Sequence, residues 1–172
     1  MKNTIRMFWV FVVIIMCFSL FSSLSIAAKI TEPDIIGVFY LLNSTDGTLT
    51  QLERQMAVSR AAFRATAELK GDKSPVRIKN GQKQEFIIQL ANGVDPSGYS
   101  LYQFIVKNGK RYVVLATGTL FGAKSEVSTL PFNVTRYGLK SYKFEPAENL
   151  PPGEYAFNPP GESNNSFCFG VD

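Results

Sequence analysis

The sequence predicts an all-β fold in which two antiparallel sheets stack behind an N-terminal hydrophobic segment. Beyond that segment, runs of four to eight residues rich in Val, Ile, Phe and Tyr alternate with clusters of Pro, Gly, Asn, Asp and Ser. This spacing is typical of sandwiches and barrels. The Asn108-Gly109 pair adds a tight hairpin, and residues 150–155 add a sharp turn between two late strands.

The first 28 residues are expected to be a signal peptide, whose apolar part is helical. Lys2 and Arg6 precede an uncharged stretch at residues 7–24, and small residues follow up to Ala28. A basic start, an apolar middle and a small-residue end make up a secretory leader. The apolar stretch has eighteen residues, so the alternative is an uncleaved membrane anchor. Either way the remainder crosses the membrane, which predicts a periplasmic or secreted protein.

Residues 29–172 have the size of a single domain. The chain holds 18 basic and 14 acidic residues, and removal of Lys2 and Arg6 lowers its net charge from +4 to +2. Because the charges are interspersed, we expect no nucleic acid partner, which would require a concentrated basic face. Cys17 leaves with the leader, so Cys168 has no partner for an intramolecular disulfide and the fold depends on packing.

The first predicted strand is an apolar run at residues 36–42, which forms a hairpin with residues 49–53. Residues 55–70 carry both helical and alternating patterns, and we expect their second half to be a strand. Residues 118–137 are expected to be a long connection with at most one short strand, at residues 132–135. The remaining strands are expected at residues 76–79, 85–90, 102–107, 110–116, 141–144, 154–157 and 166–171.

The hairpin at residues 102–116 carries the candidate binding site. Its Asn-Gly turn predicts a type I′ geometry, with positive φ at both central residues. Lys107, Lys110 and Arg111 crowd this turn, and such a basic tip suits an anionic surface. The alternative is a solvated tip whose lysines discourage aggregation between strand edges.

The late turn contains Leu150, Gly153 and Tyr155, which match a tyrosine corner. Immunoglobulin-like sandwiches place such a corner near the chain end, where the chain crosses sharply between sheets. The leucine is expected to fill the core, the glycine to set the turn, and the tyrosine hydroxyl to bond upstream backbone. The fold class predicted is therefore an immunoglobulin-like antiparallel β-sandwich, and the alternative for this motif is a plain proline-rich turn.

Four further segments carry a family resemblance. They read Lys-Ser-Pro-Val-Arg at residues 73–77, Gln-Glu-Phe at 84–86, Pro-Gly-Glu-Tyr-Ala-Phe at 152–157 and Phe-Cys-Phe-Gly-Val-Asp at 167–172. Together they resemble uncharacterised exported bacterial proteins with an immunoglobulin-like domain. The resemblance covers most of residues 29–172 and implies a fold but no activity, because its motifs are turn and core residues.

The absence of histidine restricts the chemistry that this chain can perform. It removes the usual Ser and Cys triads, zinc proteases and most transition-metal sites. We therefore expect no catalytic residues, cofactor or metal. Cys168 alternates with phenylalanines, which predicts a buried structural thiol. Tyr99, Tyr112 and Tyr137 are candidates for stacking on sugars, although aromatic side chains in small sandwiches usually pack in the core.

The leading functional hypothesis is a non-enzymatic binding or interaction module of the cell envelope. Its partner would be a protein or an envelope component, bound through loops or an exposed sheet edge. The alternatives are a purely structural envelope component and a small glycan hydrolase that uses two carboxylates among Glu53, Glu68 and Glu85. A cleft between paired acids would favour the hydrolase, and an open strand edge would favour binding.

Overall fold

The computed structural model describes residues 30–60, 64–79, 81–119, 122–125, 128–161 and 164–172. These residues form fourteen β-strands and one 3-10 turn, η1 at Pro96–Gly98. Nearly all strand pairs are antiparallel, so the all-β, antiparallel prediction is confirmed. The predicted signal peptide at residues 1–28 lies outside the described residues.

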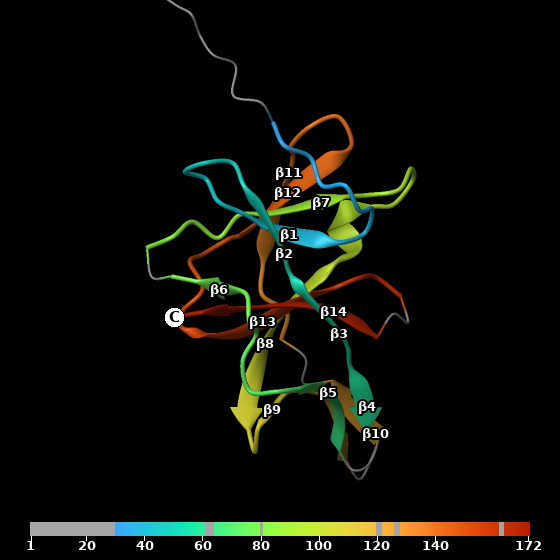
Figure 1. Ribbon diagram of the computed structural model, residues 1–172. Coiled ribbons are helices and arrows are strands. Elements are labelled where there is room, and N and C mark those ends of the chain that lie inside the picture. The colour runs from blue at the N-terminus through green and yellow to red at the C-terminus, as the bar shows by residue number, and fades with distance from the viewer. Residues whose placement is uncertain (1–29, 61–63, 80, 120–121, 126–127, 162–163) are drawn as a thin grey trace, which may run out of the picture.

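A five-stranded sheet occupies the upper part of the molecule (Figure 1). Its strands, in spatial order, are β11 (Phe132–Arg136), β12 (Ser141–Pro146), β7 (Phe86–Gln89), β1 (Phe39–Leu42) and β2 (Leu49–Gln51). β1 and β2 form the predicted hairpin, with Tyr40 opposite Gln51. This order leaves β11 and β2 at the two edges of the sheet.

The other nine strands form a second sheet, which closes on itself. Its main path runs through β3 (Glu53–Met56), β14 (Asn165–Val171), β13 (Gly153–Asn158), β8 (Ser100–Lys107), β9 (Lys110–Thr119), β5 (Arg64–Lys70) and β4 (Val58–Arg60). β10 (Gly122–Ser125) pairs with β9, and β6 (Arg77–Ile78) pairs with β14 in parallel. Only Ala57 separates β3 from β4, so the path begins and ends on one continuous segment.

The main core lies where the two sheets face each other. Phe39 of the five-stranded sheet stacks on Phe157 of the second sheet, with ring centroids 4.5 Å apart. Phe86 contacts Phe169 with a tilted geometry, also with ring centroids 4.5 Å apart. All four rings are fully buried. Such aromatic pairs stabilise a core beyond the area that they bury, so these contacts hold the sheets together.

A second, smaller core lies inside the closed sheet. Its buried residues are Ala57, Leu69, Phe104, Ala156 and Cys168. Because side chains alternate along a strand, β14 directs Phe167 and Phe169 into the main core and Cys168 into this second one. The prediction that this strand is packed on both faces is confirmed.

The β8–β9 hairpin has the predicted turn. Asn108 and Gly109 have φ values of 53° and 70°, as a type I′ turn requires. Lys107 lies opposite Lys110, and the residues next to them pair as expected. The apolar face of the hairpin was expected to face the core, and the core that it reaches is the second one, through Phe104.

Residues 53–70 and 118–137 both contain more strands than the sequence predicted. Residues 53–70 hold β3, β4 and β5, so the predicted strand in their second half is confirmed and the first half is also extended. The expectation of at most one strand within residues 118–137 is wrong, because β10 precedes β11. β10 pairs with the end of β9, placing Ala123 opposite Gly118. A backbone ladder of this kind needs no alternating apolar pattern, which is why the sequence did not reveal it.

Candidate functional sites

The predicted binding tip is divided by the structure, with Lys107 and Lys110 in solvent and Arg111 buried. The Lys110 ammonium lies 3.3 Å from Glu68 Oε2 on the neighbouring strand. Both lysines line a shallow depression of about 370 Å³ beside Tyr112. The exposed part of the tip therefore consists of two lysines, one of which is already paired with a carboxylate.

The prediction that Arg111 belongs to an exposed tip is wrong. Its side chain is 1% exposed, and Nη1 lies 3.0 Å from Glu53 Oε2. The remaining guanidinium nitrogens donate to the carbonyl oxygens of Lys70 and Gly71. Arg111 is buried because it lies opposite Leu69 of β5, which is 2% exposed, and directly opposed residues share one face of a sheet.

Arg111 belongs to a buried ionic cluster centred on Glu154. Arg111 Nη1 lies 3.6 Å from Glu154 Oε2, and the same oxygen accepts a 2.8 Å hydrogen bond from the Ser74 amide. Arg77 pairs with the other oxygen of Glu154 and, at 2.6 Å, with Asp172. The hydrogen bond from Arg77 lowers the pKa of the Asp172 carboxyl. The cluster thus ties β6, β9, β13 and the C-terminus together.

A glycine within β14 was the sequence signal for this cluster, and it went unrecognised. A Cβ atom at Gly170 would overlap the Arg77 guanidinium and approach Glu154 Oε1 to 2.7 Å. Glycine inside a strand often marks such a close approach of another group. The cluster therefore occupies space that this glycine leaves open.

The three carboxylates considered for hydrolysis are each paired with an arginine or lysine side chain. Glu53 binds Arg111, and Glu68 lies 3.0 Å from Arg60, whose hydrogen bond lowers the pKa of Glu68. Burial acts to raise the pKa of Glu85, but hydrogen bonds from a serine hydroxyl and from Lys143 outweigh it and the pKa is lowered. A glycosidase acid needs a raised pKa, whereas the environments of Glu68 and Glu85 lower theirs.

The three candidate sugar-stacking tyrosines are dispersed. Tyr99 is 8% exposed and packs edge-on against Phe39 in the main core, and burial raises the pKa of its hydroxyl. Tyr112 lines the depression at the hairpin tip, and Tyr137 is half-buried. Tyr99 therefore has a structural role, and of the other two tyrosines only Tyr112 lies beside the lysines of the tip.

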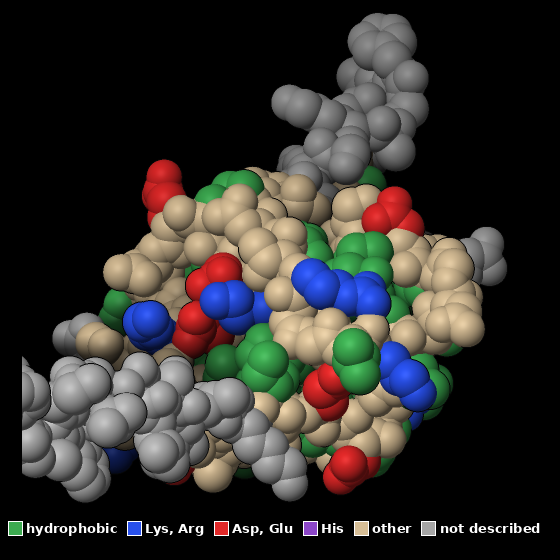
Figure 2. Space-filling view, turned by 90° about the horizontal axis from the view of Figure 1, so that it is seen from above, with side chains coloured by type: hydrophobic (Ala, Val, Ile, Leu, Met, Phe, Trp, Pro, Cys, Tyr) green, Lys and Arg blue, Asp and Glu red, His purple; other side chains and the backbone are tan. Residues whose placement is uncertain are grey.

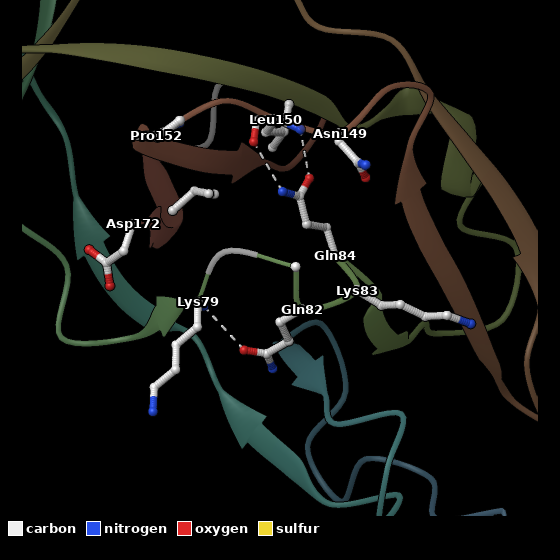
Figure 3. Close-up of a pocket in the computed structure, with 10 residues that line it drawn as sticks. Lys79, Gln82, Lys83, Gln84, Asn149, Leu150, Pro152 and Asp172 are labelled. Carbon is white, nitrogen blue, oxygen red and sulfur yellow. Dashed lines mark hydrogen bonds between the residues drawn. The ribbon is translucent and has the colours of Figure 1, made fainter.

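The corner residues make the contacts that such a motif requires. The Tyr155 hydroxyl donates to the Pro151 carbonyl oxygen at 2.8 Å, and its ring is 1% exposed. Leu150 is buried in the main core, and its backbone forms two hydrogen bonds with the Gln84 side chain, of 2.8 and 3.1 Å (Figure 3). Gly153 starts β13, and a Cβ atom there would lie 3.3 Å from the Tyr155 ring. The turn is thus fixed from both sides.

A polar pocket of about 280 Å³ lies beside this corner (Figure 3). Its lining includes Lys79, Gln82 and Lys83, together with Gln84 and Asn149. The Gln84 amide is occupied by Leu150, and Figure 3 shows the two lysine side chains extending out of the pocket in different directions. The polar groups do not converge on one point, as a specific ligand site would require.

Cys168 is fully buried in the second core. Burial raises its thiol pKa to about 12. A nucleophilic cysteine requires the thiolate, so this residue is a structural component of the fold.

The outer edge of β11 is open among the described strands. Among the described strands, β11 pairs only with β12. Ala147 N donates to Pro131 O and Tyr137 N donates to Ser141 O, so the odd-numbered residues of β11 point their backbone groups toward β12. In an antiparallel pair, every second residue points its N–H and C=O away from the partner. Here those residues are Phe132, Val134 and Arg136, and no other described strand pairs with their outward groups.

A groove of about 490 Å³ runs beside this edge. It is lined by Tyr99 and Leu130 as well as by β11 itself, and Phe132 and Val134 are half-buried against the main core. Leu130 also bridges to Leu101 of the second sheet. The groove therefore combines an apolar seam between the sheets with outward backbone groups to which no other described strand pairs.

Among the described residues, no helix is long and apolar enough to cross a bilayer. The same residues contain no group of three or more carboxylate or cysteine side chains placed to hold a metal ion. Comparison with known proteins found no matching family model, no matching curated protein and no matching solved structure.

Proposed function

We propose that the protein is an exported, non-enzymatic binding module of the cell envelope that captures an extended segment of a protein partner along β11. Residues 1–28 direct its export, and the domain that follows is an immunoglobulin-like sandwich. The open outer edge of β11, flanked by an apolar groove, is the observation that supports this function.

An extended segment fits this edge through two kinds of contact. Its backbone would bond to the outward N–H and C=O groups of Phe132, Val134 and Arg136, which supplies affinity without sequence selection. Alternate side chains would enter the groove over Tyr99 and Leu130, which selects apolar residues at every second position. The favoured ligand is therefore a stretch with alternating apolar residues.

The opposite edge of the same sheet is a poorer site. β2 has three residues, and the side chains of Thr50 and Gln51 are exposed. A strand this short offers few backbone groups, and natural proteins use short edge strands to discourage pairing. β2 therefore serves as an internal control. The lysines at the β8–β9 tip remain a second surface for an anionic envelope component.

The test compares proline at the two edges. Val134→Pro removes an outward N–H of β11 but no hydrogen bond to β12. Gln51→Pro likewise removes an outward N–H of β2. Because Leu52 N donates to Phe39 O, the neighbouring Gln51 points its backbone groups away from β1. Random decapeptides displayed on phage would be selected on the wild-type protein. We expect selected peptides with alternating apolar residues, at least about tenfold weaker binding to Val134→Pro, and unchanged binding to Gln51→Pro.

Amide hydrogen exchange identifies the bound edge directly. A selected peptide should slow exchange at Phe132, Val134 and Arg136, and leave Leu49 and Gln51 unchanged. Peptides without alternation, or equal binding to both proline variants, would show that β11 is not the binding edge. Cleavage of a glycan panel by the purified protein would instead favour the hydrolase.

A further inference from the structure

The turn between β11 and β12 carries an exposed leucine, and hydrogen bonds hold the backbone of this turn. Leu139 is 84% exposed, the highest value among the large exposed hydrophobic residues of the described chain. Its amide and that of Lys140 donate to the Glu32 carboxylate at 2.7 and 3.1 Å, and the Ser141 hydroxyl donates to it at 2.7 Å. The Arg136 guanidinium binds the carbonyl oxygens on the same turn. The turn is thus held through its backbone while its leucine stays in solvent.

The same contact gathers further apolar side chains at this end. Glu32 fixes the first described segment of the chain to the turn, and Gly138 leaves room for it, because a Cβ there would lie 2.5 Å from Glu32 Oε1. Ile30, Ile35 and Ile36 on this segment are 58%, 49% and 55% exposed. Ile36 bridges to Gln89, which pairs with Ser141 beside the turn. Four large aliphatic side chains therefore share one end of the molecule.

The position of the N-terminus suggests what covers this end. The chain enters the described domain at Ile30, and the preceding residues include the uncharged apolar stretch 7–24. Figure 2 views this end from above and shows hydrophobic side chains next to basic ones, with acidic side chains on the same face. Aliphatic residues flanked by cations favour the interface of a bilayer, where the apolar groups enter the acyl boundary and the cations meet the headgroups.

We infer that this end of the domain, formed by Ile30, Ile35, Ile36 and the turn at Leu139, lies against a lipid bilayer with Leu139 inserted into the interface. The inference does not depend on peptide capture at β11. It places the bilayer contact opposite the β8–β9 hairpin, which lies at the far end of the molecule (Figure 1).

The test places an environment-sensitive fluorophore at either end. Leu139→Cys and Lys107→Cys replace exposed residues, and the protein would carry Cys17→Ser wherever the leader is retained. Cys168 is buried with a pKa of about 12 and would stay unlabelled. The labelled protein, as the cell produces it, would be bound to vesicles of phosphatidylethanolamine and phosphatidylglycerol that contain nitroxide-labelled lipid.

We expect a blue-shifted emission and strong nitroxide quenching at position 139, and neither at position 107. A Leu139→Asn variant should bind vesicles about tenfold more weakly where the leader has been removed, since burial of a leucine contributes about that factor. Where the leader is retained and keeps this end near the bilayer, the same substitution should reduce the quenching of a label at Ile35→Cys without abolishing it. Equal quenching at positions 139 and 107, or none at either, would overturn the inference, and neither result bears on peptide binding at β11.

Discussion

Removal of the buried guanidinium in Arg111→Met should destabilise the domain by about 3 kcal/mol. Methionine fills much of the volume of the arginine stem, so the change mainly removes charge and hydrogen bonds. The lost contacts are those to Glu53 at 3.0 Å, to Glu154 at 3.6 Å and to two carbonyl oxygens. Breaking a buried ion pair typically costs about 3–5 kcal/mol, because the partner is left uncompensated.

The lower end of that range applies because both acids keep other partners. Glu154 retains Arg77 and the Ser74 amide, and Glu53 retains the Gln55 side chain at 2.6 Å. For a domain of this size, about 3 kcal/mol corresponds to a Tm roughly 10 °C lower. Calorimetry and urea unfolding would both report the loss.

Lys110→Met is the matched control for this prediction. Lys110 precedes Arg111 in the chain, but its side chain is 53% exposed and its ion pair with Glu68 lies in solvent, so we expect little change in Tm. The double variant Arg111→Met with Glu53→Gln should recover part of the loss by removing one orphaned charge. If Arg111→Met behaved like Lys110→Met, Arg111 would have to lie in solvent, and the burial argument would be refuted.

Two further predictions concern the corner and the N-terminal clamp, which is the contact of the Glu32 carboxylate with residues 139–141. Tyr155→Phe should lower stability by about 1–3 kcal/mol because the Pro151 carbonyl loses its donor. This loss should appear as a lower urea midpoint at an unchanged slope, whereas Tyr112→Phe, at a half-exposed tyrosine, should leave the midpoint unchanged. Equal midpoints for the two variants would show that the corner hydrogen bond contributes nothing. The hydrogen bond from Ser141 lowers the pKa of Glu32 below 4.5, so the clamp is fully formed above that pH and is lost as the pH falls through the lowered value. The amide resonance of Leu139 should follow this acid transition in NMR spectra, and a transition that persists in Glu32→Gln would contradict the assignment.

Local sequence was sufficient for most strands and for the hairpin turn. Alternating and continuous apolar runs predicted the strands at both ends of the chain, because side-chain period and burial are properties of each segment. The Asn-Gly pair predicted both the turn type and its register, since few residues adopt two consecutive positive φ angles. Residues 150–155 likewise contained the turn formers and the tyrosine whose hydroxyl reaches Pro151.

The order of the strands within each sheet could not be predicted from local sequence. β11 was predicted as a strand, but its position at a sheet edge depends on which strands pair, and β6 and β10 show no pattern strong enough to reveal their partners. Glu32 carried no sequence signal at all, because its partners lie more than 100 residues away. These features arise from pairing between distant segments, which a local pattern does not encode.

The sequence by itself determined that this chain forms short strands, where it turns tightly and that Cys168 is buried. Tertiary structure alone decided that Arg111 lies in a buried cluster and not at the exposed tip, that one sheet closes around a second core, and that β11 has an open edge. The physical reason is that extended structure and turns follow from the conformational preferences of neighbouring residues, whereas burial of a charge depends on which distant strand lies opposite it.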